Sequence, residues 1–242
     1  MKIAVGIVNK FVSIGIIEGN EFLAAKENLD QTTNTVQKLI QNGQSFVSRK
    51  TFKEVGTGVP INQVDFQAPI SKTNKIICVG INYPKIYDDK LQAKPENIII
   101  FSRHLETIVG HNAPLKLPSG SAKNSFDYEG EIAIVIGEPA FKVSPKNAMK
   151  HIFGYTLFND GSVRDWQKSS LFAGKNFFQS GACGPYIVTR DEISEFESII
   201  LETKVNGKTV QEARLSEMFF SIQDLLSYIS NIIPLNSGDI IA

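Results

Sequence analysis

The chain has 242 residues, of which 42% are hydrophobic and 21% are charged, as in an ordinary folded globular protein. Its 25 basic and 25 acidic residues cancel, so the charge predicts no binding to nucleic acid or to an acidic membrane. The N-terminus lacks a signal-peptide pattern and no apolar run reaches membrane-spanning length, so we expect a cytoplasmic protein. Cys78 and Cys183 are too few for a disulfide framework, and both are predicted to be reduced, partly buried thiols.

The first 70 residues predict a small α/β domain. Alternating apolar residues indicate two strands, over residues 3–8 and 12–17, with a turn at Glu18-Gly19-Asn20. Helical spacing of apolar residues indicates a helix over residues 31–42. Ala68-Pro69-Ile70, which follows a polar stretch, is expected to be the linker to a second domain over residues 71–242.

The second domain predicts many strands and few helices. A helix is expected over residues 145–151, and another over 221–232 has one apolar stripe formed by Ile222, Leu225, Leu226 and Ile229. Asn206-Gly207 predicts a hairpin turn. This pattern favours a β-rich α+β fold over a doubly wound sheet. The expected strands cover residues 75–80, 98–101, 115–117, 131–136, 154–159, 186–189, 201–205 and 208–211.

Carboxylates gather where two of these strands begin or end. Glu129 and Glu131 share one face of a strand at its mouth, because side chains alternate along a strand. Asp160 ends a second apolar stretch and is placed to supply a third oxygen ligand. Three carboxylates without a neighbouring His or Cys favour Mg²⁺, Mn²⁺ or Ca²⁺ over zinc. The alternative is a solvated acidic strand end paired with Lys123 or Lys175.

The motifs together resemble the fumarylacetoacetate hydrolase family over about residues 75–242. The cluster Asp127-Tyr128-Glu129-Gly130-Glu131 is the most specific of them, and the others follow in the family's order. These others are Lys75 to Tyr83, Gly154-Tyr155-Thr156 through Asn159-Asp160, Arg164-Asp165 with Gln167, Gly174-Lys175, Gly184-Pro185, Val205-Asn206-Gly207 and Gly238 to Ile241.

The resemblance implies a β-roll around a divalent ion, Mg²⁺ or Mn²⁺, with Ca²⁺ as an alternative, held by Glu129, Glu131 and Asp160. It implies an enzyme acting on 2-oxo or 2-hydroxy-dienoic acids as a hydrolase, decarboxylase, isomerase or tautomerase, in a homodimer. Metal chelation of the substrate stabilises the enolate that these reactions share. Lys175, Arg164 and Asp89 are the candidate catalytic residues, and Tyr83, Arg103, Gln167 and Lys175 are the candidate substrate-binding residues. For Arg164, Gln167 and Lys175, a purely structural ion pair or hydrogen bond is the alternative.

Two departures from the family pattern bear on the reaction. Hydrolytic members carry a water-activating His and Glu after the Asn-Tyr turn, where this chain has Ile86 and Asp89. Isoleucine accepts no proton, so isomerase or tautomerase chemistry is favoured over hydrolysis. The loop over residues 84–95 is expected to be a mobile lid, with Asp88 or Asp89 as a substitute base.

The second departure is that the chain stops at Ala242, where the family continues into a turn that closes the site, which leaves open a truncated C-terminus.

The rival to an enzyme is a family member that has lost catalysis and retains only a binding or interaction role. His104 or His111 could reach the pocket from a loop, whereas His151 is expected at a helix end. Met218, Phe219 and Phe220 are expected in the core or at a dimer interface.

Overall fold

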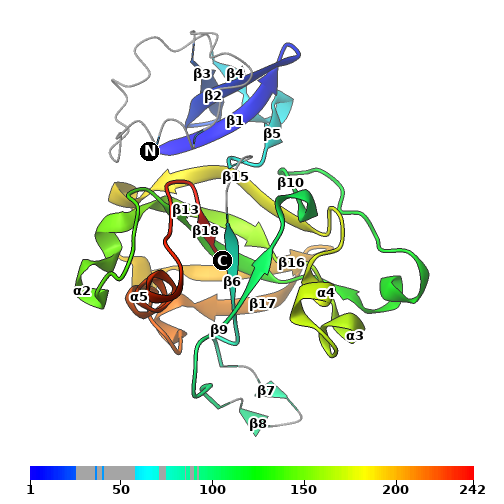
Figure 1. Ribbon diagram of the computed structural model, residues 1–242. Coiled ribbons are helices and arrows are strands. Elements are labelled where there is room, and N and C mark those ends of the chain that lie inside the picture. Colours follow the sequence, from blue (N-terminus) through cyan, green and yellow to red (C-terminus); the bar gives the residue numbers. More distant parts are fainter. Residues whose placement is uncertain are drawn as a thin grey trace.

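The computed structural model describes residues 1–25, 36, 40, 58–70, 75–84, 86–87, 90–91 and 93–242. Within these ranges the molecule is built around one large sheet, with short helices at its margins (Figure 1). The central path of this sheet runs β4-β3-β2-β1-β15-β13-β12-β18-β6-β9, and β5 and β10 pair with β1 and β15. Its strands are β1 Lys2–Val8, β2 Phe11–Glu18, β3 Glu21–Ala24, β4 Val59–Pro60, β5 Asp65–Gln67, β6 Ile76–Gly80, β9 Ile99–Arg103, β10 Ile108–Val109, β12 Gly130–Ile136, β13 Ile152–Asn159, β15 Gly181–Thr189 and β18 Ile240–Ile241.

Three small ribbons lie outside the large sheet. They pair β7 Ile86–Tyr87 with β8 Lys90–Leu91, β11 Phe126–Asp127 with β14 Ser162–Val163, and β16 Ile200–Val205 with β17 Lys208–Arg214. The β16–β17 hairpin turns at Asn206-Gly207 as expected, because both residues adopt the positive φ that such a turn requires. The strand-rich α+β class predicted from the sequence is confirmed.

The N-terminal strands pair differently from the prediction. Strands β1 and β2 occur where expected, but the turn between them lies at Asn9 and Lys10, whose φ angles are 51° and 71°. The predicted turn at Gly19 and Asn20 instead connects β2 to a third strand, β3. The error arose because Asn9-Lys10 carries no glycine, although asparagine tolerates this conformation well.

The expected boundary near residue 70 does not interrupt the sheet. Strand β1 pairs with β15 through Lys2↔Val188, Ile3↔Ile187 and Ala4↔Tyr186. β5 lies within the stretch that was expected to lead into the linker, and Ile70 of the expected linker is buried in the core. The division into two domains stays a prediction, but the strands on both sides of it share one core.

The helices are short. α2 (Pro145–Ala148) continues into a 3-10 turn that ends at His151, and α5 (Ile222–Ile232) begins after the N-cap Ser221, whose Oγ accepts from Asp224 N at 3.2 Å. The apolar stripe of α5 is buried as predicted, and α5 packs beside α2. Of the expected helix over residues 31–42, only Val36 and Ile40 are described, and both are helical and buried. No helix of the described chain is long and apolar enough to span a membrane.

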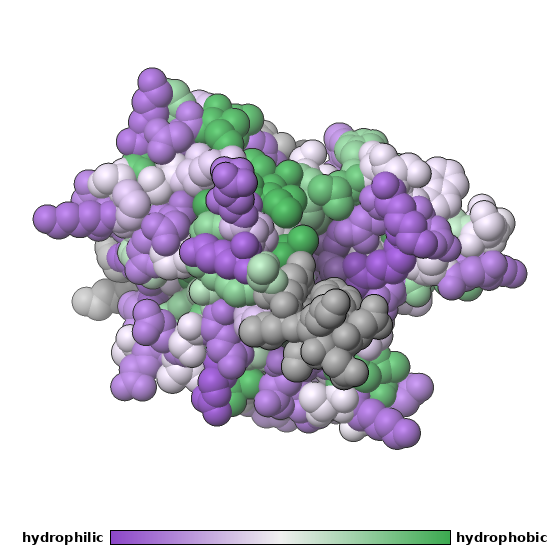
Figure 2. Space-filling model, turned by 90° about the horizontal axis from the view of Figure 1, so that it is seen from below, coloured by the Kyte–Doolittle hydropathy of each residue, from purple (hydrophilic) through white to green (hydrophobic). Residues whose placement is uncertain are grey.

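One predicted strand is absent, and two helices were missed. Residues 115–117 lie between Pro114 and Pro118 and form no strand, because proline interrupts a ladder of hydrogen bonds. α3 (Arg164–Gln167) and α4 (Leu171–Lys175) are too short to show helical periodicity in the sequence. They flank the carboxylate cluster and carry the residues that face it. Seen from below, the surface is mostly hydrophilic, with apolar residues gathered near its centre (Figure 2).

Candidate metal centre

Three carboxylates converge from two adjacent strands of the large sheet. Glu129 lies between β11 and β12, Glu131 is the second residue of β12, and Asp160 follows β13 directly. The antiparallel pairing of β12 with β13 brings these positions together, since Gly130 faces Asn159 and Glu131 faces Phe158. Asp160 N also donates to Glu129 O at 2.8 Å, which fixes the two backbones against each other.

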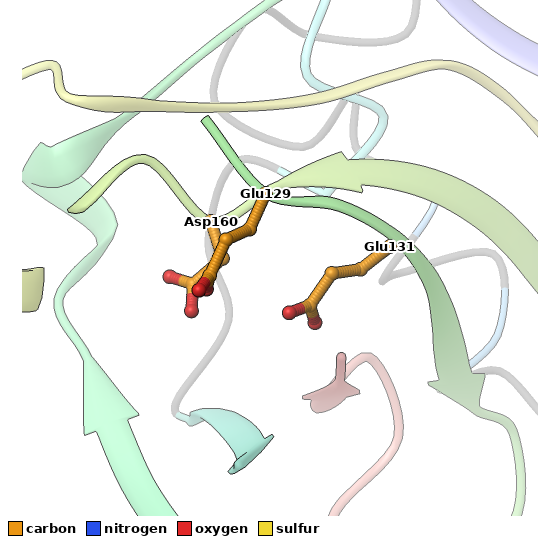
Figure 3. Close-up of side chains that lie close together, drawn as sticks. All are labelled: Glu129, Glu131 and Asp160. Carbon is orange, nitrogen blue, oxygen red and sulfur yellow. The ribbon is translucent and has the colours of Figure 1, made fainter. Parts of the chain in front are cut away.

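The carboxylate groups point into one shared space (Figure 3). One ligand atom from each of Glu129, Glu131 and Asp160 lies within 4.8 Å of the other two, and Asp160 is fully buried. Carboxylates this close repel one another in a partly buried site unless cations lie among them. The structure therefore brings together the three residues that the sequence predicted as metal ligands.

Lys175 is the first cation beside this cluster. Its Nζ donates to Asp160 Oδ2 at 2.6 Å and also to Glu129 Oε2. It ends α4, which packs tightly on α3, since a Cβ on Gly174 would lie 2.6 Å from Gln167 Cα. The glycine before Lys175 is thus required for this close approach.

Arg164 and Arg103 supply two further positive charges. Arg164 Nη1 lies 2.5 Å from Glu129 Oε1, and its Nε and Nη2 both donate to Asp127 Oδ2. Arg103 is fully buried and donates from Nη1 to Asp160 Oδ1 at 2.5 Å. Arg103 contacts Asp160 and is not among the residues that line the cavity, and its contact with substrate stays a prediction.

The surroundings shift the pKa values of the two glutamates in opposite directions. Burial acts to raise the pKa of Glu129, but Lys175 and Arg164 outweigh it and hold this pKa below its usual value. The pKa of Glu131 is raised well above its usual value by burial and by the charges of Asp160 and Glu129. No described residue donates a hydrogen bond to the Glu131 carboxylate or pairs with it. Among the described residues, Lys175 and Arg103 lower the pKa of Glu131 from a distance, but neither forms an ion pair with it.

A cavity of about 510 Å³ opens over the carboxylates. The polar and charged residues of its lining include Glu129, Glu131, Asp160, Arg164, Gln167, Lys175 and Tyr83. The apolar residues of its lining include Phe196, Leu201, Leu215, Met218 and Leu225. Burial, with the charges of Glu131 and Glu217, raises the pKa of Tyr83 to about 12, so its hydroxyl stays protonated at neutral pH.

Other predicted residues lie elsewhere or outside the described chain. Asp89 is not among the described residues, and Ile86 is described only as part of β7. His104 and His111 do not line the cavity, and His151, at the end of its helical turn, has its Nδ1 3.2 Å from Glu138 O, which accepts a hydrogen bond from it. Cys78 and Cys183 are free and buried, and burial raises the pKa of both thiols, whereas an activated cysteine nucleophile has a lowered pKa.

The sequence analysis missed Gln211 of β17, which lines the cavity and contacts the backbone between the two glutamates. It follows the Asn-Gly turn by four residues, on a strand that carried no other signal of function. The spacing along the chain gave no sign that the β16–β17 hairpin reaches the carboxylates.

The donor set fits a hard divalent cation. Oxygen ligands from three carboxylates are what Mg²⁺, Mn²⁺ and Ca²⁺ prefer, and a bound cation would offset the burial and repulsion that raise the pKa of Glu131. Nitrogen or sulfur ligands, which zinc prefers, are absent from this group of described residues.

Comparison with known proteins agrees with this geometry. The sequence model of the family described as fumarylacetoacetate (FAA) hydrolase C-terminal matches residues 75–242, which is more than half of the chain. The chain belongs to the fumarylacetoacetate hydrolase family. The oxaloacetate tautomerase of Bacillus subtilis (strain 168) is 32% identical over 265 residues, which cover all of this chain and 87% of that relative. The mitochondrial oxaloacetate tautomerase of Rattus norvegicus is 31% identical over 94% of this chain and 72% of its own length.

Solved structures of the fumarylacetoacetate hydrolase family share this fold. The 2-hydroxyhepta-2,4-diene-1,7-dioate isomerase from Mycobacterium marinum superposes with a TM-score of 0.76 at 31% identity. The fumarylacetoacetate hydrolase from Exiguobacterium antarcticum superposes with a TM-score of 0.82 at 28% identity. Both comparisons cover 100% of this chain and 85% of the other. The chain is therefore an enzyme of the fumarylacetoacetate hydrolase family.

Proposed function

We propose that this enzyme binds one Mg²⁺ or Mn²⁺ ion through Glu129, Glu131 and Asp160 and interconverts the keto and enol forms of a 2-oxo acid such as oxaloacetate. Ca²⁺ is the alternative ion. The observation that carries the proposal is the convergence of three carboxylates within 4.8 Å at the lining of a cavity, with no described cation in an ion pair with Glu131. When bound, the metal supplies a Lewis acid that stabilises the negative charge of an enolate.

Tautomerase chemistry is supported over hydrolysis by two observations. The Bacillus relative that matches the whole chain is named for oxaloacetate tautomerisation. Ile86 stands where hydrolytic members carry the histidine that activates water. Moving a proton between the oxygen and carbon atoms of an enol requires an acid and a base but no activated water.

The described residues supply charge and hydrogen bonds for this reaction. The ammonium of Lys175 stands at the floor of the cavity and stabilises an oxyanion or a substrate carboxylate. Arg164, oriented by Asp127 and Glu129, lies on the same side with Gln167, whose Oε1 accepts from Arg164 Nη1 at 3.3 Å. The protonated hydroxyl of Tyr83 is a hydrogen-bond donor to the substrate. Asp89 is proposed as the base that takes up the proton.

The decisive experiment is a tautomerase assay. Enol-oxaloacetate is mixed with the purified protein, and the loss of its ultraviolet absorbance is followed with Mg²⁺, with Mn²⁺ and with a chelator. We expect metal-dependent acceleration that Glu131→Gln abolishes. An acylpyruvate and 2-hydroxyhepta-2,4-dienedioate are assayed in parallel. Conversion of either substrate without acceleration of oxaloacetate tautomerisation would overturn the proposed reaction while leaving the metal site in place.

We also propose that the protein is a cytoplasmic homodimer. The resemblance to the family supports the dimer, and the two free, buried cysteines support a reducing compartment. Sedimentation equilibrium at micromolar concentration tests the assembly, and a monomer would contradict it. Cell fractionation tests the location.

A further inference from the structure

Gly130 is the residue between the two glutamates of the carboxylate cluster, and its peptide groups set the direction of both side chains. Consecutive side chains on a strand point to opposite faces, so Glu129 and Glu131 face one cavity only while the backbone at Gly130 keeps its extended course. Small rotations here would separate the two carboxylates. The groups that hold this backbone therefore matter to the spacing of the proposed metal ligands.

On one edge, called here the inner edge, the segment from Glu129 to Glu131 is bonded to β13 and to Asp160, which follows it. Glu129 N donates to Asn159 Oδ1 at 3.2 Å, and Glu129 O accepts from Asp160 N at 2.8 Å. The N–H and C=O groups of Gly130 point to the opposite edge, because the backbone groups of successive strand residues alternate in direction. On that outer edge β18 pairs with β12 only at Ile134 and Val135. No described strand forms ladder pairs with β12 on that edge beside Gly130.

One side chain occupies the place of the missing strand. Gln211 Oε1 accepts from Gly130 N at 3.0 Å, and Gln211 Nε2 donates to Gly130 O at 2.6 Å. A side-chain amide thus forms the two bonds that a neighbouring strand would form. Thr203 Oγ1, on the partner strand β16, donates to Gln211 Oε1 at 3.3 Å and fixes the amide's orientation.

The close approach of the hairpin depends on the glycine. A Cβ on Gly130 would lie 2.0 Å from Thr203 Oγ1, so any other residue would force Thr203 of the β16–β17 hairpin to shift. The hairpin also forms part of the cavity wall through Leu201 and Ala213. The contact therefore joins a wall of the cavity to the backbone that carries two of the three carboxylates.

We propose that Gln211 is a positioning residue that sets the spacing of Glu129 and Glu131 by holding Gly130 from the outer edge. The inference rests on the proposed metal site. Groups that orient metal ligands from outside typically contribute a factor of about 10–100 in metal affinity. Gln211 acts through the backbone and not through a side chain of the ligand set.

The test compares Mn²⁺ binding by the parent, by Gln211→Met and by Thr209→Val, using calorimetric titration. Methionine is similar in length and forms neither bond, and Thr209 is an exposed residue of the same strand that serves as the control. We expect Gln211→Met to weaken Mn²⁺ binding about 10–100-fold, with the control unchanged. Parent and Gln211→Met with equal dissociation constants would overturn the inference. A parent that binds no Mn²⁺ would instead overturn the proposed function.

Hydrogen exchange separates positioning from general destabilisation. In the metal-free protein, Gln211→Met should speed exchange in the segment containing Gly130 while exchange in α5 stays at the parent rate. Faster exchange throughout the chain would contradict a local role. Should Gln211→Met fail to fold, Thr203→Val removes only the hydroxyl that orients the amide. It should weaken Mn²⁺ binding by a smaller factor, and unchanged affinity in that variant would also overturn the inference.

Discussion

Arg103 holds Asp160 from behind, with its Nη1 2.5 Å from Oδ1, while Lys175 contacts the other carboxylate oxygen. The guanidinium also donates to Gly161 O, to Ser180 Oγ at 2.7 Å and to Thr107 Oγ1. All of these hydrogen bonds are to protein groups, so the Arg103 side chain holds the Asp160 carboxylate in position.

Replacing Arg103 should strongly destabilise the fold. Arg103→Met leaves Asp160 buried without one of its two partners, and removing one member of a buried pair typically costs about 3–5 kcal/mol. Urea denaturation of parent and variant measures the difference. Lys168→Met serves as the control, because that lysine pairs with Asp165 on the surface. A loss in Arg103→Met as small as that of the control would contradict a supporting role for Arg103.

Glu131→Gln should stabilise the metal-free protein at neutral pH. The folded-state pKa of Glu131 is raised, so its favourable contribution is present below the unfolded value of about 4.3 and is lost as the pH rises through the folded value. Glutamine keeps the shape and removes the charge repelled by Asp160 and Glu129. The melting temperature of the variant should exceed that of the parent at pH 7, and the gap should shrink toward pH 4. If the difference in melting temperature instead grows as the pH falls, Glu131 is not repelled by Asp160 and Glu129 as proposed.

Lys175→Met should reduce turnover while leaving cation binding in place. The ammonium that stabilises developing negative charge is lost, and a loss of one such donor typically lowers the rate about 10²–10³-fold. Steady-state kinetics and Mn²⁺ titration of the same preparation measure both properties. Lys168→Met again provides the matched control on a nearby exposed lysine. Parent-like kinetics in Lys175→Met would remove this residue from the reaction.

Ile86→His combined with Asp89→Glu should introduce hydrolysis. The pair restores the water-activating residues of hydrolytic family members, and general base catalysis contributes about 10²–10⁴-fold. The assay follows acylpyruvate hydrolysis and oxaloacetate decarboxylation by parent and double variant. A parent that already hydrolyses at about 10 s⁻¹, the usual enzyme median, would contradict the role assigned to Ile86.

The carboxylate cluster could be predicted from the sequence because its three residues lie at the ends of neighbouring strands, and strands are recognised from short local patterns. Side chains alternate along a strand, so Glu129 and Glu131 could be placed on one face from the sequence alone. Placing Asp160 beside them required only the expectation that two consecutive strands pair. The place of Arg103 could not be predicted this way, because it depends on Asp160 and Ser180, which lie 57 and 77 residues further along the chain. Gln211 was missed for the same reason, since its partner Gly130 is 81 residues away. Short helices such as α3 and α4 could not be predicted, because four or five residues are too few to show a helical repeat of apolar residues.

The pairing of β1 with β15 affects which fragments of the chain can be produced without aggregation. The family match begins at residue 75, yet the segment that carries Ile187 and Val188 borders the N-terminal strands. A fragment starting near residue 75 would leave the N–H and C=O groups along this part of β15 open to other chains, and exposed sheet edges promote aggregation. A fragment that carries the carboxylate cluster therefore needs a replacement for β1 along this edge. In the whole chain, β1 protects this part of β15 from pairing with other molecules.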